Sequence, residues 1–426
     1  MAQVRLKTLA VIAAIVAVST LSSLGLLVIF EIAYRMVEAR AGYPKADALD
    51  VFRFKPYVMT ALPPGPADKD SPLGRYFGIS KLDTNPGVAI QVNKQGFRGR
   101  EFPPPQSKTP GTIRLVITGG SAAVSWNIDE KRALDTLLAE RVQREFPGKT
   151  VEVYNLAGAA WKSFQELIAI QWLALPMDPD VIIHFSGFND SFHSYFWEPD
   201  IAYNAGLFEV LVQKEVVRLR SGAREFLNDL RALNAMKTWT QPEPPVLDRP
   251  APSPPRSLAP QAAGATPGKM ATLPNFPLDL DAIAARSDFD PYGRRVADYY
   301  LRNEALMARS ANLAGATLIS ALQPSLYLKK AIGPREEGML RNPNYAETVN
   351  FSVQNYLRIK AGLERLARDE PNVSFIDLSS PFDEIEGDVF HDNVHFSAEG
   401  YAVVADRLAA KVVTVLQSRS APSPRN

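Results

Sequence analysis

The chain has 426 residues, of which 46% are hydrophobic, so it can bury the core of one catalytic-size domain with additional segments. Its 47 basic and 46 acidic residues nearly cancel, and no basic run is interleaved with aromatic residues, which argues against nucleic acid as a partner. The absence of cysteine excludes a disulfide scaffold, a cysteine-ligated zinc site and a cysteine nucleophile.

The first apolar element is an uncharged run of 23 residues over 8–30, long enough to cross a bilayer at about 1.5 Å per residue. It predicts a single-pass transmembrane anchor over 1–30. Basic residues before the run favour a cytoplasmic N-terminus and an extracytoplasmic, periplasmic catalytic domain, although basic residues after it weaken this bias. A cleaved signal peptide is the alternative, but the run is longer than a usual signal-peptide core and no convincing A-x-A site follows.

Residues 31–110 mix aromatic residues, Gly and Pro without sustained periodicity, which predicts a stalk that packs irregularly on the following domain. From Thr112 onward, short apolar runs rich in β-branched residues alternate with amphipathic segments, a pattern typical of βα units. The predicted strands are 113–118, 151–155, 181–185, 317–321 and 373–378. The predicted helices are 132–145, 163–174, 294–313, 345–368 and 398–417. Right-handed crossovers then give a flavodoxin-like three-layer α/β/α sandwich with a mostly parallel five-stranded sheet.

The predicted sandwich comprises residues 111–190 and 291–417, because the third and fourth strands are too far apart for one crossover. Residues 191–290 are therefore an insertion. Its first part looks helical and amphipathic, and its second part, 241–277, is crowded with Pro, Ala and Ser. We expect this second part to be an extended surface loop, with a passive spacer favoured over a polyproline ligand for a partner. Residues 418–426 are expected to be a tail.

The first predicted strand ends in Gly119-Gly120-Ser121. Open α/β sheets place their sites at the carboxyl ends of strands, and the two glycines permit a tight turn that exposes the serine side chain and its N–H. The pattern makes Ser121 a candidate nucleophile. An ordinary turn with a helix N-cap has the same pattern, so this motif does not decide the matter alone.

A second motif places Asp392 three residues before His395. An Asp at this spacing can reach the imidazole Nδ1 and fix the tautomer that leaves Nε2 free to take a serine proton. Ser397 is expected to be the N-cap of the last helix, which puts His395 in a tight loop at the sheet edge. A surface loop with an ordinary Asp–His hydrogen bond is the alternative.

The third predicted strand ends in Gly187-Phe188-Asn189-Asp190, where the Asn189 side-chain amide could donate to an oxyanion. An Asx turn that closes the strand is the alternative. Because the carboxyl ends of parallel strands meet at one edge of a sheet, we expect Asn189 to lie near the candidate nucleophile and the Asp–His pair.

These motifs resemble the sequence blocks of SGNH/GDSL hydrolases. Residues 119–121 look like the first block, 155–160 the second, 187–190 the third and 392–395 the last, in the same order and with similar spacing. The resemblance covers about residues 114–408 outside the insertion. It implies a serine esterase or acyltransferase without cofactor or metal, in which Ser121 is the nucleophile, His395 its base and Asp392 the residue that orients the base. Residues 93–99 are also similar to a segment that precedes the first block in membrane-anchored members.

The resemblance further implies an oxyanion hole made by the N–H groups of Ser121 and Ala160 and by the Asn189 amide. The family usually has glycine where this chain has Ser125 and Ala160. An alanine keeps the required N–H provided that its φ remains negative. Gly158 is expected to supply local flexibility, or the donor itself if the loop register shifts.

The expected substrate is an acylated carbohydrate or lipid of the cell surface, and hydrolysis and acyl transfer both stay open. The sequence indicates no particular protein partner. Two other classes remain as alternatives. The first is a catalytically silent, membrane-anchored scaffold of an envelope assembly, which the two departures from glycine favour. The second is a metal hydrolase with His391, Asp392 and His395 as ligands, although no H-E-x-x-H or comparable motif completes such a site.

Overall fold

The structure is a computed structural model. It describes residues 53–55, 58–62, 64–67, 90–125, 128–195, 279–285, 291–340 and 346–420. The predicted transmembrane anchor over 1–30, most of the predicted insertion with its Pro-rich part, and most of the predicted tail lie outside these residues. Among the described helices, none is both long enough and apolar enough to cross a membrane.

A five-stranded parallel sheet organises the described part of the chain. Along the sheet, its strands are β6 (Thr150–Asn155), β5 (Thr112–Gly119), β7 (Val181–Ser186), β8 (Thr317–Leu322) and β9 (Val373–Asp377). All four pairings are parallel. Within this sheet β5 comes first along the chain and β6 second, and β6 lies at the edge beside β5, which is the flavodoxin-like strand order. The prediction of five mostly parallel strands is confirmed, and each predicted strand agrees with the observed one to within one residue at either end.

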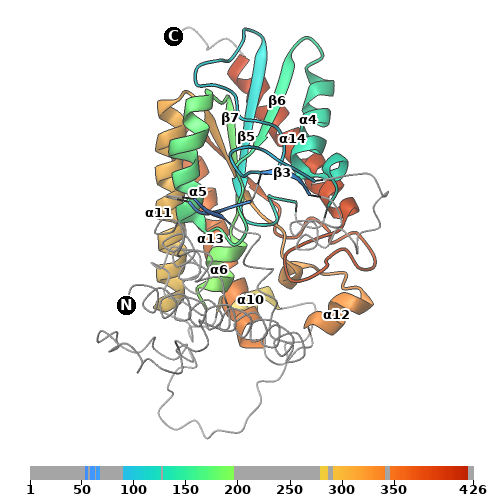
Figure 1. Ribbon diagram of the computed structural model, residues 1–426. Helices are drawn as coiled ribbons and strands as arrows, with labels where there is room; N and C mark the ends of the chain where they lie inside the picture. The colour runs from blue at the N-terminus through green and yellow to red at the C-terminus, as the bar shows by residue number, and fades with distance from the viewer. Residues whose placement is uncertain are drawn as a thin grey trace, which may run out of the picture. The chain divides into compact units, whose positions relative to one another are not determined.

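Helices cover both faces of this sheet, which explains why its central strands are buried along their whole length. Every position of β5 and β7 is buried. Figure 1 shows α4 (Leu134–Glu145) and α14 (Ala398–Ser420) on one side of the sheet. On the other side lie α5 (Ser163–Ala169), α11 (Tyr292–Leu313) and α13 (Ala346–Asp369).

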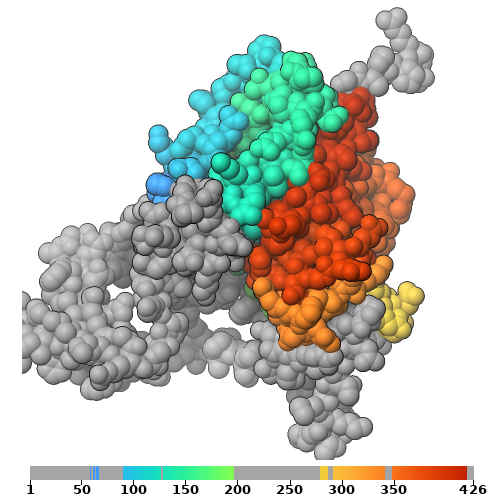
Figure 2. All heavy atoms as spheres, turned by 90° about the vertical axis from the view of Figure 1, so that its right-hand side faces the viewer, coloured from blue at the N-terminus to red at the C-terminus, as the bar shows by residue number. Residues whose placement is uncertain are grey.

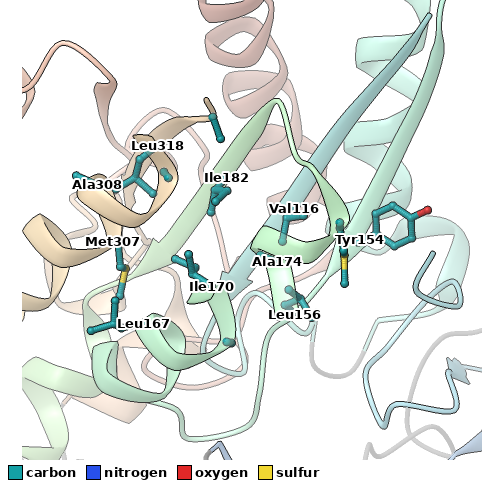
Figure 3. Close-up of a cluster of buried hydrophobic side chains, with 14 of the residues drawn as sticks. Val116, Tyr154, Leu156, Leu167, Ile170, Ala174, Ile182, Met307, Ala308 and Leu318 are labelled. Carbon is teal, nitrogen blue, oxygen red and sulfur yellow. The ribbon is translucent and has the colours of Figure 1, made fainter. Parts of the chain in front are cut away.

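A large hydrophobic cluster lies between the sheet and the layer formed by α5 and α11 (Figure 3). Val116, Ile182 and Leu318 project from three neighbouring strands, and they pack with Ile170 and Met307 from the helical layer. Complete burial of a side chain of this size is worth about 1.5–3 kcal/mol. This cluster therefore fixes the helices on the sheet and, with them, the loops that leave the carboxyl ends of the strands.

Short antiparallel pairs precede the sheet in the predicted stalk. β1 (Arg53–Lys55) pairs with β2 (Met59–Ala61), and β3 (Gly65–Ala67) pairs with β4 (Ile90–Val92). The chain after β4 enters the domain, because Phe97 is buried in the same cluster as the sheet residues. This part of the predicted stalk thus belongs to the core.

The second predicted helix, 163–174, differs in the structure. The α-helical part α5 ends at Ala169, and it continues as a π-helical turn η3 (Ile170–Ala174) and a 3-10 turn η4 (Leu175–Met177). An apolar periodicity near 3.6 does not distinguish α from π winding, and Pro176 in η4 prevents a further regular turn. The remaining short helices are η2 (Glu130–Arg132), α6 (Phe188–His193), α10 (Leu280–Ala284), η5 (Leu326–Leu328) and α12 (Pro334–Leu340).

Candidate active site

Three residues from opposite ends of the domain form one chain of hydrogen bonds. His395 Nε2 lies 2.7 Å from Ser121 Oγ, and His395 Nδ1 lies 2.6 Å from Asp392 Oδ2. Ser121 follows β5, whereas Asp392 and His395 lie on the loop between β9 and α14. The structure therefore brings together the nucleophile, base and orienting residue predicted from the sequence.

The Asp392 carboxylate is fixed by the backbone of its own turn. Its Oδ1 accepts the N–H groups of Val394 and His395 at 2.9 and 2.8 Å. Burial alone would raise the pKa of this carboxyl, but hydrogen bonding and the charge of His395 hold the pKa below its usual value. The ionised carboxylate accepts Nδ1–H of the imidazole, which leaves Nε2 to accept the Ser121 hydroxyl. Ser397 caps α14 as predicted, since its Oγ accepts the Gly400 N–H at 3.3 Å.

The turn that follows Ser121 is held by buried side chains from three other segments. Each of them donates to the backbone carbonyl oxygens of residues 122–125. Tyr401 donates to the first carbonyl at 2.9 Å, Asn155 to the second at 2.8 Å, and Arg98 to the last two at 3.2 and 2.7 Å. Because the orientation of the Ser121 side chain depends on this turn, these donors hold Ser121 in place.

Arg98 gives a physical role to the motif at residues 93–99. Its buried guanidinium also forms a salt bridge with Glu130 at 3.2 Å. The neighbouring Phe97 packs edge-on against Trp161, with ring centroids 5.9 Å apart. The motif thus contacts both the nucleophile turn and the loop that follows β6. The sequence pointed to this motif only through its family resemblance, because nothing in a single sequence shows which distant carbonyls an arginine binds.

Asn189 lies directly against the nucleophile turn. A β-carbon at Gly120 would lie only 2.4 Å from Asn189 Nδ2, so any side chain at this position would displace the Asn189 amide. Asn189 Nδ2 donates to the Trp161 carbonyl at 2.7 Å. A side-chain amide nitrogen carries two hydrogens, so one donor remains for a ligand oxygen.

The loop after β6 departs from the sequence-based expectation at Ala160. A negative φ was the condition under which alanine was expected to keep its N–H for the oxyanion, and this condition is not met, because φ is +57°. Ser125, the other departure from the family pattern, has a φ of +59°. Both positions therefore have the left-handed backbone that glycine adopts most readily, which accounts for the family preference and shows that Ala160 keeps a glycine-like conformation.

The donors available in this loop follow from its backbone hydrogen bonds. The Gly158 N–H donates to the Gly119 carbonyl at 3.1 Å, so the expectation that Gly158 could act as the oxyanion donor is not met. Gly158 is needed for packing instead, because a β-carbon there would overlap the Trp161 indole at 2.1 Å. Among the described residues, no backbone carbonyl accepts the N–H of Ser121 or Ala160. These two N–H groups remain as candidate donors.

Replacing Ala160 by glycine is expected to stabilise the fold by about 0.5–1 kcal/mol. Glycine removes the steric cost of the left-handed φ, which is about 1–2 kcal/mol for alanine. This gain exceeds the loss of about 0.4–1 kcal/mol that glycine causes by raising the conformational entropy of the unfolded chain. The N–H is kept, so kcat should stay within about threefold of wild type. Urea unfolding and ester hydrolysis measure the two effects. Ala159→Gly is the matched control, because Ala159 has no positive φ and its replacement should destabilise; stabilisation by both variants would contradict the explanation.

A buried polar network lies behind this loop and fixes its far end. Asp190 accepts the backbone N–H and the hydroxyl of Ser163, the first residue of α5, at 2.9 and 2.6 Å. Nearby, His184 on β7 lies 2.6 Å from Glu166 and 2.5 Å from Glu304. Burial alone would lower the pKa of His184, but the charges of Glu304 and Glu166 raise it to about 10. The resulting imidazolium ties α5 and α11 to the central strand.

The alternative set of metal ligands does not form in the described part of the chain. His391 Nδ1 faces the Arg335 guanidinium at 3.2 Å, a cationic group that a metal ligand would avoid. Within the described ranges, no three His, Asp or Glu side chains are grouped so that they could hold a metal ion.

A match to a known protein family agrees with this arrangement. Residues 120–408 match the family described as GDSL-like Lipase/Acylhydrolase. The chain belongs to this family. The matched range includes Ser121, Asn189, Asp392 and His395. The protein is therefore a GDSL-type serine esterase, as the sequence predicted.

The solved structures to which the chain is similar are distant in sequence. A catalytic mutant of an acetylxylan esterase from Geobacillus stearothermophilus is 11% identical, with 70% of this chain and 94% of that chain covered and a TM-score of 0.37. A lipase from a goat rumen metagenome is also 11% identical, with 70% and 96% covered and a TM-score of 0.38. No curated protein matches the chain. Likenesses of this size carry no information about the substrate.

Proposed function

We propose that this esterase cleaves acyl esters with Ser121 as nucleophile, His395 as general base and Asp392 as the residue that orients the base. The observation that carries the proposal is the hydrogen-bond chain from Ser121 Oγ through His395 to Asp392, with distances of 2.7 and 2.6 Å. A serine hydroxyl is a weak nucleophile until a base removes its proton, and this arrangement supplies that base.

The reaction follows from this geometry. Ser121 Oγ attacks the ester carbonyl while His395 Nε2 takes its proton, and Asp392 stabilises the imidazolium that forms. The tetrahedral intermediate collapses, His395 protonates the departing alcohol, and an acyl group remains on Ser121. His395 then takes a proton from water, which attacks the acyl-enzyme and forms a second tetrahedral intermediate. This intermediate collapses with Ser121 Oγ as the leaving group, His395 returns the proton to that oxygen, and the acid is released.

We propose that the oxyanion of both tetrahedral intermediates is bound by the N–H groups of Ser121 and Ala160 and by the second hydrogen of Asn189 Nδ2. The two N–H groups are supported by their lack of a backbone acceptor among the described residues, and Asn189 by its position against Gly120. A preorganised donor of this kind is worth about 10²- to 10³-fold in rate.

We propose an acylated carbohydrate or lipid of the cell surface as the substrate, reached by a catalytic domain on the extracytoplasmic side of a membrane anchor over 1–30. The uncharged apolar run over 8–30 supports this placement. Deacylation by a second alcohol in place of water would make the same site an acyltransferase. The scaffold alternative loses the support of Ser125 and Ala160, because both keep a glycine-like backbone.

The test is labelling of the full-length protein in detergent with a fluorophosphonate, which reacts only with an activated serine. We expect labelling of wild type and none of Ser121→Ala or His395→Ala. Ser107→Ala is the control, because this exposed serine only donates to the Pro104 carbonyl, and it should label like wild type. A folded wild type without labelling, or equal labelling of Ser121→Ala, would overturn the proposed roles.

A further inference from the structure

A buried ion pair outside all the recognised motifs lies beside the loop that carries Asp392 and His395. Lys329 follows η5, and Glu336 lies in the first turn of α12. Their side chains are 1% and 0% exposed, and Lys329 Nζ lies 2.6 Å from Glu336 Oε2. Burying two charges is costly, so such a pair is stable only if further hydrogen bonds satisfy both groups.

The backbone of the catalytic loop supplies most of these hydrogen bonds. Glu336 Oε1 accepts the N–H groups of residues 389–390, each at 2.8 Å. Its Oε2 also accepts the Gly333 N–H at 2.9 Å. On the other side of the pair, Lys329 Nζ donates to the Gly387 carbonyl at 2.6 Å. The ion pair thus binds the incoming limb of the loop at three backbone groups, which belong to residues 387, 389 and 390.

The first turn of α12 forms further hydrogen bonds with this loop, closer to Asp392 and His395. Asp388 Oδ1 accepts the N–H groups of Arg335 and Glu336 at 3.0 and 3.1 Å. The Arg335 guanidinium donates to the His391 carbonyl at 3.1 Å. Every residue from 387 to 391 is therefore bound by Lys329 or by the first turn of α12, and the next residue is Asp392.

The outgoing limb of the loop is bound in turn to the anchored limb. The His391 N–H donates to the His395 carbonyl at 2.7 Å, and the Ser397 N–H donates to the Val389 carbonyl at 2.8 Å. His395 therefore sits on a hairpin whose first limb is fixed from outside. Figure 2 shows the orange residues of the α12 region lying against the red C-terminal segment.

We propose that Glu336, with Lys329, is a positioning residue that holds the His395 imidazole at hydrogen-bonding distance from Ser121. This inference rests on the proposed function, because it assigns Glu336 a role through His395. Glu336 binds loop backbone, so its loss should slow the proton-transfer steps and leave substrate binding nearly unchanged. A displacement of about 1 Å at a reacting group costs about 100-fold in rate.

The experiment compares wild type with Glu336→Gln in the full-length protein. We expect kcat for p-nitrophenyl acetate and the fluorophosphonate labelling rate to fall about 100-fold, with KM changed less than about threefold. Hydrogen exchange of peptides covering 387–397 should quicken at least about tenfold, which measures the anchoring itself without reference to activity. Lys330→Met is the matched control. It breaks only the exposed pair with Asp383, at 3.1 Å, and should leave all three measurements unchanged.

A folded Glu336→Gln variant with wild-type turnover, labelling and exchange would overturn the inference. If Glu336→Gln does not fold, Lys329→Met is the variant to test, because Glu336 keeps its three backbone donors in it. A fall in kcat of at least about tenfold in Lys329→Met supports the inference, and a wild-type kcat overturns it. A wild type that neither labels nor hydrolyses would instead overturn the proposed function. Faster exchange of 387–397 in the variant would still establish the anchoring in that case.

Discussion

Replacing either Ser121 or His395 by alanine is expected to lower kcat by about 10⁶-fold, and the double replacement should lower it no further. The reason is that the two side chains act as one unit, with Ser121 Oγ and His395 Nε2 2.7 Å apart. Without the base the hydroxyl stays protonated, and without the hydroxyl the base has no nucleophile to activate. The residual rate comes from substrate binding and the oxyanion donors acting on water.

Single-turnover hydrolysis of p-nitrophenyl acetate by the purified variants measures this cycle, because it separates chemistry from product release. Thermal unfolding of each variant shows that the loss is chemical, since Ser121 and His395 are both partly exposed and their removal leaves little cavity. Two losses that add on a logarithmic scale in the double variant would contradict a shared role, because they would mean that Ser121 and His395 act in separate steps.

The sheet could be predicted from the sequence because its strands are buried on both faces. In β5, the residues Leu115, Val116 and Ile117 form an apolar run, and the end of the strand at Gly119 is marked by a turn. The proximity of Ser121, Asp392 and His395 could be predicted for a related reason. Asp392 and His395 are neighbours in the chain, and parallel strands bring their carboxyl ends to one edge, so only the pairing with Ser121 depended on the fold.

The backbone conformation at Ala160 and Ser125 could not be predicted from residue type. Alanine and serine rarely adopt a positive φ, and only the surrounding turns impose it here. The family preference for glycine was the one available signal, and its physical meaning is a left-handed backbone. The departures therefore concern local stability more than the presence of the N–H donors.

The sequence also did not predict the long-range hydrogen bonds that hold the loops of the site. Arg98 binds carbonyls of the nucleophile turn, and Glu336 binds N–H groups of the loop that carries the base. Each is a buried charged residue that contacts backbone 26 or more residues away in the chain. Because a backbone group has the same chemistry at every position, neither partner leaves a pattern in the sequence. The two anchors fix opposite sides of the 2.7 Å contact between Ser121 and His395.

Replacing Asn189 by alanine is expected to lower kcat by about 10²- to 10³-fold with little change in KM, because a donor to the oxyanion acts only once charge has developed. Asn189→Asp should be slower still, since it replaces the donor by a carboxylate that repels the oxyanion. Loss of Nδ2 also removes the 2.7 Å hydrogen bond to the Trp161 carbonyl, which should cost about 0.5–1.5 kcal/mol of stability.

Steady-state kinetics of these variants separates the effect on kcat from the effect on KM. Asn312→Ala, at the exposed end of α11, is the control and should match wild type. The fluorophosphonate adduct gives a second comparison, because its phosphoryl oxygen occupies the oxyanion position and its formation should slow in parallel with kcat. A loss that appears in KM alone would mean that Asn189 holds the ground-state substrate. Equal rates for Asn189→Ala and Asn189→Asp would place the oxyanion away from Nδ2, leaving the N–H groups of Ser121 and Ala160 as its donors.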